Sequence, residues 1–306
     1  MIVKEPLVSV IIPTYKRPDF LDRAIDSVLN QTYKNIEVIV VDDNNPDTEG
    51  RRRTEGIMEK YSNNPLVHYV KHECNKNGSA ARNTGFRASH GEYVAFLDDD
   101  DQYLPKKIES QVEKMESLSS DWGCCYNQYF TQRGDEKPLP VKESREGGLE
   151  LYKEALMHKG LCVNAGSNFM VRREAYQAIN GYDESFKRNQ DHEFMVRMLY
   201  KYKMAYVPEP GLIYSVGTTN VPINYEEVIR HYIDKFMPYV LKLGKDEQLE
   251  FHKCMNRYLI INHLKTGHIL KIIKMVSNHE VDCLNTLRWI TETASGFIQR
   301  RIKVKQ

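Results

Sequence analysis

The first hundred residues alternate between short β-branched runs and amphipathic helical patterns, and this alternation restricts the fold more than any other feature. The run Leu7–Ile12 is apolar throughout and is stopped by Pro13, as is typical of a strand buried on both faces. Further runs of this kind lie at 36–41, 67–70 and 93–97. Helical patterns separate them, and the first begins at Pro18. Repeated strand–helix–strand units predict a parallel sheet with helices on both faces.

The pattern changes after Pro105. An amphipathic helical pattern leads to a strand pattern over 122–130, and a polar stretch over 132–148 is expected to be a mobile loop. From about Tyr225 onward the periodicity is helical. We therefore expect an α/β fold whose main domain has two halves, 1–105 and 106–222, followed by a helical C-terminal region, 223–306.

The charge balance and the cysteines argue against several classes of protein. Lys and Arg number 43 against 42 Asp and Glu, so a net charge of +1 provides no global attraction for nucleic acid. The six cysteines show no C-x-x-C spacing, which disfavours a zinc knuckle or a redox dithiol, and we expect reduced cytoplasmic thiols. The N-terminal segment lacks the pattern of a signal peptide, and no 18-residue apolar run predicts a membrane span.

Polar clusters directly follow three of the predicted strands. Pro13-Thr14-Tyr15 follows the first strand, Asp42-Asp43 the second, and Asp98–Asp101 the strand at 93–97. In open parallel sheets, ligands bind outside the carboxyl ends of the strands. The sequence therefore predicts a ligand site that is built from these three segments.

The four consecutive aspartates predict a cation site. Their mutual repulsion is relieved when a divalent cation such as Mg²⁺ or Mn²⁺ binds among them together with phosphate oxygens. Residues two apart on an extended segment face the same side, so Asp98 and Asp100 are expected to converge on one ion. A solvated acidic loop is the alternative, and Asp101 is as well suited to capping the next helix as to binding a metal.

The segment 77–83 has the composition of a turn that leads into a helix of small residues. The N-terminus of such a helix favours an anion, and Arg82 has the planar fork that pairs with a diphosphate. A tightly packed helix with a surface arginine is the alternative.

Together these segments resemble the family-2 inverting glycosyltransferases, which have a GT-A fold. The matching motifs are Val8–Arg17, Val40–Asp43, Ala81–Gly85, Gly91–Tyr93, Phe96–Asp101, Gly181–Glu184 and Gln190–Phe194. Their order and spacing extend over about the first 200 residues. The last 80 or so match no pattern of the family.

The resemblance implies roles for individual residues. Pro13, Thr14 and Tyr15 would line the base pocket, with the Tyr15 ring stacked on uracil, and Asp43 would accept a hydrogen bond from the base. Arg82 would contact the diphosphate. Asp98, Asp99 and Asp100 would form the D-x-D element, with Asp100 as the direct metal ligand and Asp99 facing the ribose. Two further residues of the motif-bearing segments, Arg17 and Asn77, are assigned to nucleotide-sugar binding.

Asp191 lies where the family keeps its catalytic base. Direct inversion requires a carboxylate that removes the proton of the acceptor hydroxyl. Asp191 starts an amphipathic helix in the second half of the chain, so it can face the metal site across a cleft. A plain helix N-cap is the alternative role. Glu193 points elsewhere on the same helix and is a weaker candidate.

The expected function is that of a metal-dependent inverting glycosyltransferase, using Mn²⁺ or Mg²⁺. It would move a sugar from a UDP-sugar to a hydroxyl of a glycan or lipid-linked saccharide, in the assembly of bacterial capsule, O-antigen or teichoic acid. A dTDP- or GDP-sugar donor and a non-catalytic nucleotide-sugar-binding scaffold are the alternatives. A sugar nucleotidyltransferase or an NAD-binding domain would carry a glycine-rich loop after a strand, and Pro13–Arg17 contains no glycine.

Two features leave questions open. Many relatives have a histidine after the strand that corresponds to Tyr214, and the segment 214–220 has none. The basic end Arg300–Lys305 suits either docking on an anionic membrane surface or simple solvation. We expect a cytoplasmic protein, and contact with the inner face of the membrane and an oligomer interface in the helices from Tyr225 both stay open.

Overall fold

The computed structural model describes residues 5–217, 224–278, 281 and 284–291. The chain divides into two compact units. The first comprises residues 1–155 and 160–220, and the second comprises residues 156–159 and 221–306. The prediction that residues 1–105 form a nucleotide-sugar-binding half and residues 106–222 an acceptor-binding half stays a prediction.

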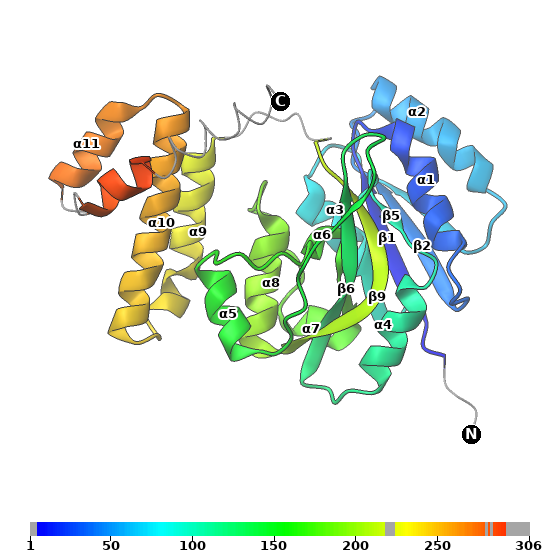
Figure 1. The fold of residues 1–306 in the computed structure, drawn as a ribbon. Coiled ribbons are helices and arrows are strands. Elements are labelled where there is room, and N and C mark those ends of the chain that lie inside the picture. The colour runs from blue at the N-terminus through cyan, green and yellow to red at the C-terminus, as the bar shows by residue number, and fades with distance from the viewer. Residues whose placement is uncertain (1–4, 218–223, 279–280, 282–283, 292–306) are drawn as a thin grey trace. The chain divides into compact units, whose positions relative to one another are not determined.

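The first unit is built around one sheet, to which nine strands contribute among the described residues (Figure 1). In spatial order, eight of them are β3 (Val67–Lys71), β2 (Ile36–Asp42), β1 (Val8–Thr14), β4 (Tyr93–Phe96), β8 (Met170–Arg172), β6 (Trp122–Gln132), β9 (Lys203–Ser215) and β5 (Gln102–Tyr103). The ninth, β7 (Leu139–Pro140), pairs with β6. The four strands predicted in the first hundred residues pair in parallel, which confirms the prediction for that part of the sheet.

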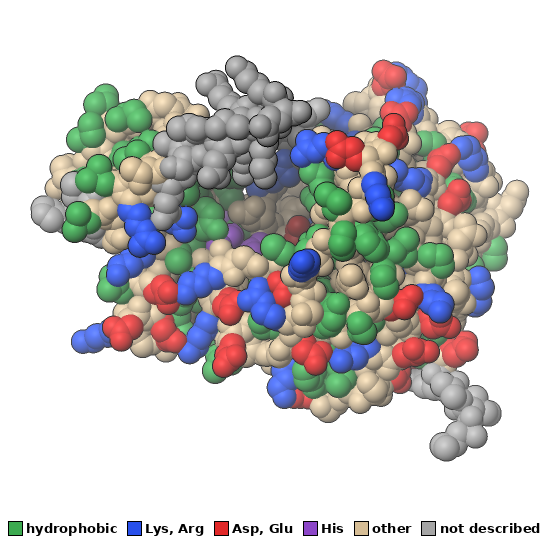
Figure 2. Space-filling view, viewed as in Figure 1, with side chains coloured by type: hydrophobic (Ala, Val, Ile, Leu, Met, Phe, Trp, Pro, Cys, Tyr) green, Lys and Arg blue, Asp and Glu red, His purple; other side chains and the backbone are tan. Residues whose placement is uncertain are grey.

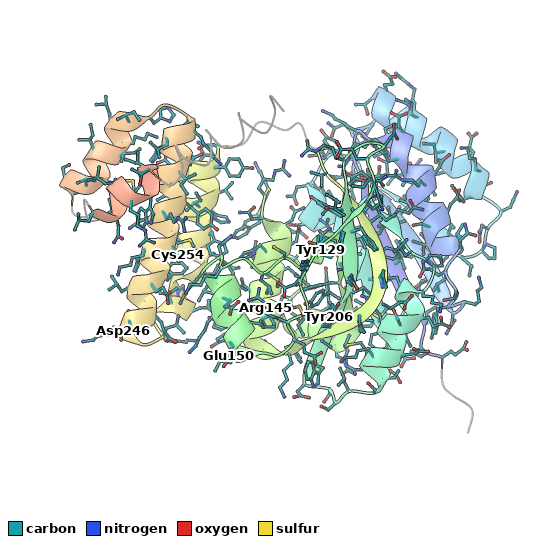
Figure 3. All side chains as sticks on the ribbon, in the orientation of Figure 1. Tyr129, Arg145, Glu150, Tyr206, Asp246 and Cys254 are labelled. Carbon is teal, nitrogen blue, oxygen red and sulfur yellow. The ribbon has the colours of Figure 1, made fainter. Side chains whose placement is uncertain are left out.

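The second half of the sheet is mixed. β8 pairs antiparallel with both β4 and β6, while β6 and β9 run parallel over most of their length. Tyr126 and Tyr129 lie on β6, and Tyr206 lies on β9, where its ring is 5.4 Å from that of Tyr126 (Figure 3). The sheet is therefore a mixed one, GT-A-like in its architecture.

Helices cover both faces of the sheet because its strands are apolar on both sides. The side chains of Val8, Val10 and Ile12 pack in one core cluster with α1 (Pro18–Leu29) and α4 (Lys107–Glu116). On the other face lies α3 (Gly78–Ala88), where a Cβ at Gly85 would lie 2.4 Å from the Ile11 side chain. Only glycine permits this approach, so α3 packs tightly against the sheet.

Aromatic side chains fill the space beyond α3 on this second face. The ring of Phe96 on β4 lies 5.8 Å from Tyr176 on α7 (Arg173–Ala178) and 6.2 Å from Phe194 on α8 (Gln190–Lys201). Tyr182 stacks on Phe194 with a centroid distance of 4.2 Å. This packing fixes the first turn of α8 against the end of β4.

The remaining helices are divided between the two units. In the first unit they are α2 (Glu49–Met58), the short 3₁₀ helix η1 (Glu59–Tyr61), α5 (Leu149–Leu156) and α6 (Ala165–Asn168). In the second unit they are α9 (Tyr225–Val240), α10 (Lys245–Lys265) and α11 (Ile269–Ser277). The helical periodicity predicted from Tyr225 is present in the described part of that unit.

The polar stretch 132–148 is more structured than a mobile loop. Its β7 strand pairs with β6. The Glu143 carboxylate is buried and accepts hydrogen bonds from the Arg145 guanidinium, 2.8 Å away, and from the Cys162 backbone N–H at 3.2 Å. Most residues of the stretch are exposed, but the Glu143 carboxylate is satisfied within the protein.

Lys107, in the first turn of α4, is fully buried. Its ammonium donates to Gln111 Oε1 at 2.7 Å and lies 4.1 Å from the Tyr103 ring centroid, and neither partner carries a negative charge. Burial lowers the pKa of Lys107 to about 7. The ammonium is therefore disfavoured in the folded state.

This buried lysine predicts a dependence of stability on pH. Between pH values of about 7 and 10 the unfolded chain binds a proton that the folded chain does not, so the free energy of unfolding should rise with pH, by about 1.4 kcal/mol per pH unit from this group. We expect Lys107→Met to remove that slope, as measured by urea unfolding across this pH range. Lys106→Met, at the exposed neighbouring position, is the control. Equal slopes in the wild type and Lys107→Met would contradict the assignment.

Candidate active site

The carboxyl ends of β1, β2 and β4 meet at one edge of the sheet. Thr14 is paired with Asp42, and the Asp43 backbone N–H donates to the Thr14 carbonyl at 2.9 Å. The Leu97 backbone N–H donates to the Ile11 carbonyl at 3.0 Å. The three polar segments predicted to form a site are thus brought together by the register of these strands.

The aspartate run folds into a compact acidic cluster. One carboxylate oxygen each from Asp98, Asp100 and Asp101 lies within 4.8 Å of the others, and the Asp101 backbone N–H closes a turn onto the Asp98 carbonyl at 3.0 Å. Three carboxylates at this spacing suit a hard divalent cation. The cluster is consistent with the D-x-D metal site, and it adds Asp101 to the predicted pair, Asp98 and Asp100.

The alternative role of Asp101 as a helix cap is wrong. The N-cap position of α4 is Lys106, because β5 intervenes between the aspartates and the helix. The buried Asp101 carboxylate instead accepts hydrogen bonds from Ser167 Oγ at 2.5 Å and from the Ser215 backbone N–H at 2.8 Å. Burial raises the pKa of Asp101, and the charges of Asp98 and Asp100 add to this shift. A bound cation would favour the ionised form.

Two serines that the sequence did not single out support the cluster. Ser167 Oγ also accepts a hydrogen bond from the Asp98 backbone N–H at 3.0 Å, and Ser215 Oγ donates to the Asp100 carbonyl at 2.6 Å. Ser215 belongs to the segment in which a histidine was expected. Of that segment, residues 218–220 lie outside the described part of the chain.

Arg17 is the counter-ion of the middle aspartates. Its guanidinium lies 2.7 Å from Asp99 Oδ1 and 2.5 Å from Asp100 Oδ2. Asp99 is fully buried, and burial raises its pKa to about 7, although the Arg17 charge acts in the opposite direction. Arg17 is held at this place because it immediately precedes α1. The contact of Asp99 with a ribose and that of Arg17 with the donor stay predictions.

Arg82 is not a surface residue. Only 2% of it is exposed, its guanidinium forms an ion pair with Asp98, and it lies 5.2 Å from the Tyr182 ring centroid. The alternative of a surface arginine on α3 is therefore wrong. Arg82 is positioned beside the cluster from the first turns of α3, and its contact with a diphosphate stays a prediction.

Asp191 belongs to the second half of the chain, yet its carboxylate lies near the acidic cluster. A Cβ placed on Gly166 of α6 would lie 3.2 Å from Asp191 Oδ2 and 3.4 Å from Asp98 Oδ2, so both carboxylates border the same glycine. Burial raises the pKa of Asp191, Arg82 lowers it, and the Asp98 charge raises it again. A carboxylate with a raised pKa beside a cation site has the properties of a general base.

The structure decides two alternatives on α8, the N-cap role of Asp191 and the general-base role of Glu193. The N-cap of the helix is Asn189, in a left-handed conformation, so Asp191 is not the cap. Glu193 is fully buried and pairs with Arg197, whose guanidinium also donates to the Gly181 carbonyl at 2.8 Å. Glu193 therefore has a structural role, as its weaker standing in the sequence predicted.

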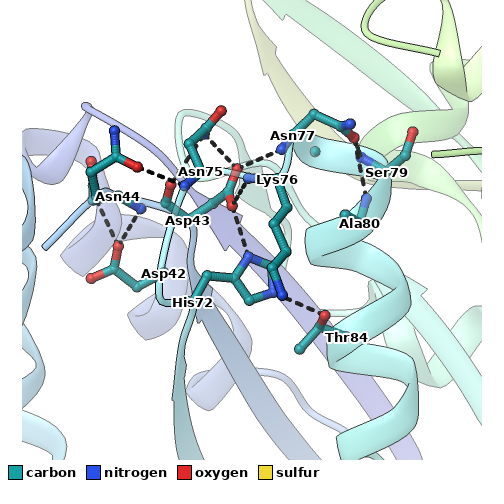
Figure 4. A network of polar contacts seen from close by, with 12 residues as sticks. Asp42, Asp43, Asn44, His72, Asn75, Lys76, Asn77, Ser79, Ala80 and Thr84 are labelled. Atoms are coloured by element: carbon teal, nitrogen blue, oxygen red, sulfur yellow. Dashed lines mark hydrogen bonds and ion pairs between the residues drawn. The ribbon is translucent and has the colours of Figure 1, made fainter. Parts of the chain in front are cut away.

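Asp43 is the centre of a network that joins three segments (Figure 4). Its Oδ1 lies 2.7 Å from His72 Nδ1 and accepts the Lys76 backbone N–H at 2.7 Å. Its Oδ2 accepts from Asn75 Nδ2 at 2.7 Å and from the Asn77 backbone N–H at 3.0 Å. These contacts use about four acceptor sites, the full capacity of a carboxylate. The hydrogen bond that Asp43 would accept from a base stays a prediction.

His72 and Asn77 complete this network. His72 Nε2 lies 2.9 Å from Thr84 Oγ1 on α3, and no motif in the sequence pointed to this histidine. Asn77, predicted as a donor-site residue, is the N-cap of α3 and accepts hydrogen bonds from the backbone N–H groups of Ser79 and Ala80 at 2.9 and 3.2 Å. Its φ of +81° and ψ of 166° lie in a region that is otherwise almost confined to glycine, so the backbone is strained at this residue.

The segment after β1 presents the remaining predicted residues. Thr14 is buried, whereas Pro13 and Tyr15 are half-buried and keep part of their surface accessible. The Lys16 ammonium lies 5.0 Å from the Tyr15 ring centroid. Stacking of Tyr15 on a base stays a prediction.

Known proteins resemble this chain over much of its length. A family model described as Glycosyl transferase family 2 matches residues 9–179. A Rickettsia prowazekii protein described as an uncharacterized glycosyltransferase is 30% identical over 265 residues, which cover 84% of this chain and 79% of the relative. The Campylobacter jejuni GalNAc(5)-diNAcBac-PP-undecaprenol beta-1,3-glucosyltransferase is 25% identical over 322 residues, which cover 92% of this chain and 98% of the relative.

Solved structures share the fold. The crystal structure of S. aureus TarS 1-349 in complex with UDP-GlcNAc matches with a TM-score of 0.62 at 16% identity, covering 95% of this chain and 80% of that one. Since a family model spans more than half of the sequence and a relative is 30% identical across most of it, this chain belongs to glycosyl transferase family 2.

Proposed function

We propose that this chain transfers a sugar from a UDP-sugar to a hydroxyl group of a glycan or lipid-linked saccharide, with inversion at the anomeric carbon. The observation that carries the proposal is the pair of carboxylates at Gly166. Asp98 belongs to a cluster that suits a cation, and Asp191 is a separate carboxylate whose pKa is raised by burial. Asp98 can help to hold a cation at the leaving diphosphate, while Asp191 removes the proton of the acceptor hydroxyl.

The chemistry assigns a task to each group. Asp98, Asp100 and Asp101 would hold Mg²⁺ or Mn²⁺, which supplies positive charge to the departing diphosphate. Arg82 adds a fixed guanidinium beside Asp98 for the same oxygens. Asp191 accepts the proton of the acceptor hydroxyl as that oxygen attacks the anomeric carbon. A single displacement needs no covalent intermediate, and hence no second nucleophilic carboxylate.

The relatives support the choice of substrates. The Campylobacter jejuni enzyme is named for a lipid-linked acceptor, an undecaprenol diphosphate saccharide, and the S. aureus TarS structures contain UDP or UDP-GlcNAc. By analogy we assign this chain a UDP-sugar donor and a role in bacterial cell-surface polysaccharide assembly, at the inner face of the membrane. No helix in the described part of the chain is long and apolar enough to cross a membrane. The basic end Arg300–Lys305, proposed as a membrane contact, lies outside the described residues.

Slow hydrolysis of candidate donors tests the proposal without knowledge of the acceptor. The protein would be incubated with UDP-, dTDP- and GDP-sugars and a divalent cation, and the release of nucleoside diphosphate measured. We expect release from a UDP-sugar that stops on addition of EDTA. If nucleoside diphosphate were released only from a dTDP- or GDP-sugar, that sugar nucleotide would replace the UDP-sugar as the proposed donor. Tight binding of a UDP-sugar without hydrolysis or transfer to any acceptor in a saccharide screen would favour a binding protein.

A further inference from the structure

In the second unit, helix α11 exposes large apolar side chains in addition to those that it buries. Ile272 and Met275 are buried in a cluster with Leu259, Ile260, Val281 and Trp289. Three other residues of the same helix, Ile269, Leu270 and Ile273, are 50%, 81% and 57% exposed. Because an α-helix turns about 100° per residue, these three share one face, next to the face that packs in the core.

The exposed apolar surface continues beyond α11. In the helical segment 284–291, Leu284 is 81% and Leu287 is 54% exposed, whereas Trp289 of the same segment is largely buried. Figure 2 shows hydrophobic side chains at the surface over α11. Single exposed leucines are common on soluble proteins, but several on adjoining helical segments mark an interaction surface.

The charged residues of α11 itself are all positive. From Lys265 to Ser277 the sequence contains three lysines and no Asp or Glu. Lys274 is exposed and stands four residues after Leu270, so it neighbours the apolar face. Lys271 is also exposed, and its ammonium pairs with Glu226 of α9 at 2.6 Å. A lysine can lay its apolar stem along such a face and keep its ammonium at the edge.

This charge distribution favours one of the possible binding partners of the apolar face over another. In a two-fold contact between copies, the same patch meets itself, so Lys274 of one α11 would approach Lys274 of the other, and α11 carries no acidic residue that would offset this repulsion. An anionic bilayer instead accepts apolar side chains at the boundary of its acyl chains and binds lysines at the level of its headgroups.

We propose that α11 docks on an anionic lipid surface, with Ile269, Leu270 and Ile273 inserted and Lys274 among the headgroups. The contact is interfacial, in line with the absence of a membrane-spanning helix from the described residues. The inference extends the proposed function, since a lipid-linked acceptor lies in such a surface. Lipid docking is inferred from the exposed face of α11 alone, and the test measures vesicle binding rather than sugar transfer.

The test is co-sedimentation of the full chain with vesicles. Vesicles of phosphatidylcholine with phosphatidylglycerol would be compared with vesicles of phosphatidylcholine alone, at low and high salt. We expect binding to the anionic vesicles that weakens with salt, and a loss of at least about tenfold in the double variant Leu270→Glu, Ile273→Glu. Lys274→Glu should weaken binding less. The control is Leu249→Glu, at an exposed position of α10, which should bind as the wild type does.

Three results would overturn the inference. One is equal binding of the double variant, which would assign the contact to another part of the chain such as the basic end. Another is equal binding of the wild type to both kinds of vesicle. The third is a wild-type dimer in light scattering that dissociates in the double variant, without vesicle binding by either. Circular dichroism checks that the variants fold, and hydrolysis of the donor, measured in the same samples, reports separately on the proposed function.

Discussion

Asp191→Asn should bind the sugar nucleotide as tightly as the wild type and transfer the sugar at least about 10²-fold more slowly, because a positioned general base contributes 10²–10⁴ to the rate. The amide is nearly the same size as the carboxylate, so the first turn of α8 should keep its shape. Binding would be measured by calorimetry, and turnover by release of the nucleoside diphosphate in the presence of acceptor.

The pH profile adds a second readout for Asp191. Because burial raises the pKa of this carboxyl, the base becomes ionised at a higher pH than an exposed aspartate does. The acid limb of the wild-type rate should therefore lie at a higher pH than an exposed aspartate would give, and it should be absent from the residual rate of Asp191→Asn. The matched control is Asp246→Asn, since Asp246 also lies in the first turn of a helix, α10, but is exposed. Near-normal turnover by Asp191→Asn would remove Asp191 from the mechanism.

Asp100→Asn should abolish the part of UDP binding that depends on a divalent cation. The neutral amide is a weaker ligand for a hard cation than the carboxylate is. Mutation of a residue that only hydrogen-bonds to a metal ligand typically lowers metal affinity about 10–100-fold. For the ligand itself we therefore expect a loss of more than about 100-fold in metal affinity. Calorimetric titration of UDP, with Mn²⁺ and with EDTA, separates the two contributions. In EDTA, the wild type and Asp100→Asn should bind UDP with similar affinity.

Two further variants sharpen this result. Asp101→Asn tests the residue that the structure added to the predicted pair, and it should also weaken Mn²⁺ binding. Asp19→Asn, at an exposed position in the first turn of α1, should leave the titration unchanged. If Asp100→Asn retained the full gain in UDP affinity on addition of Mn²⁺, the cation would have to bind elsewhere.

The parts of the site that could be predicted are those encoded locally. The apolar runs predicted β1, β2 and β4, and because parallel strands end at one edge, they also predicted that Thr14, Asp43 and Asp98 would meet. Identifying Asp191 needed the resemblance as well, since its own surroundings show only an acidic residue at the start of a helix.

The parts that could not be predicted depend on contacts between distant segments. The role of Asp101 is decided by Ser167 and Ser215, which lie 66 and 114 residues away in the chain. The antiparallel insertion of β8 between β4 and β6 depends on pairing that no local pattern specifies. His72 illustrates the same limit, because a lone histidine becomes meaningful only when the fold places Asp43 and Thr84 on either side of it.

The network around Asp43 has a consequence for the thermodynamics of ligand binding. A single carboxylate holds the end of β2, the residue after β3 and the start of α3 through hydrogen bonds within the protein. The loop between His72 and Asn77 therefore loses its conformational freedom during folding rather than on association. Ligand affinity at this edge should then carry only a small entropic penalty for ordering the protein. The heat capacity change on binding should reflect the surface that the ligand and its site bury against each other, without a contribution from ordering this loop.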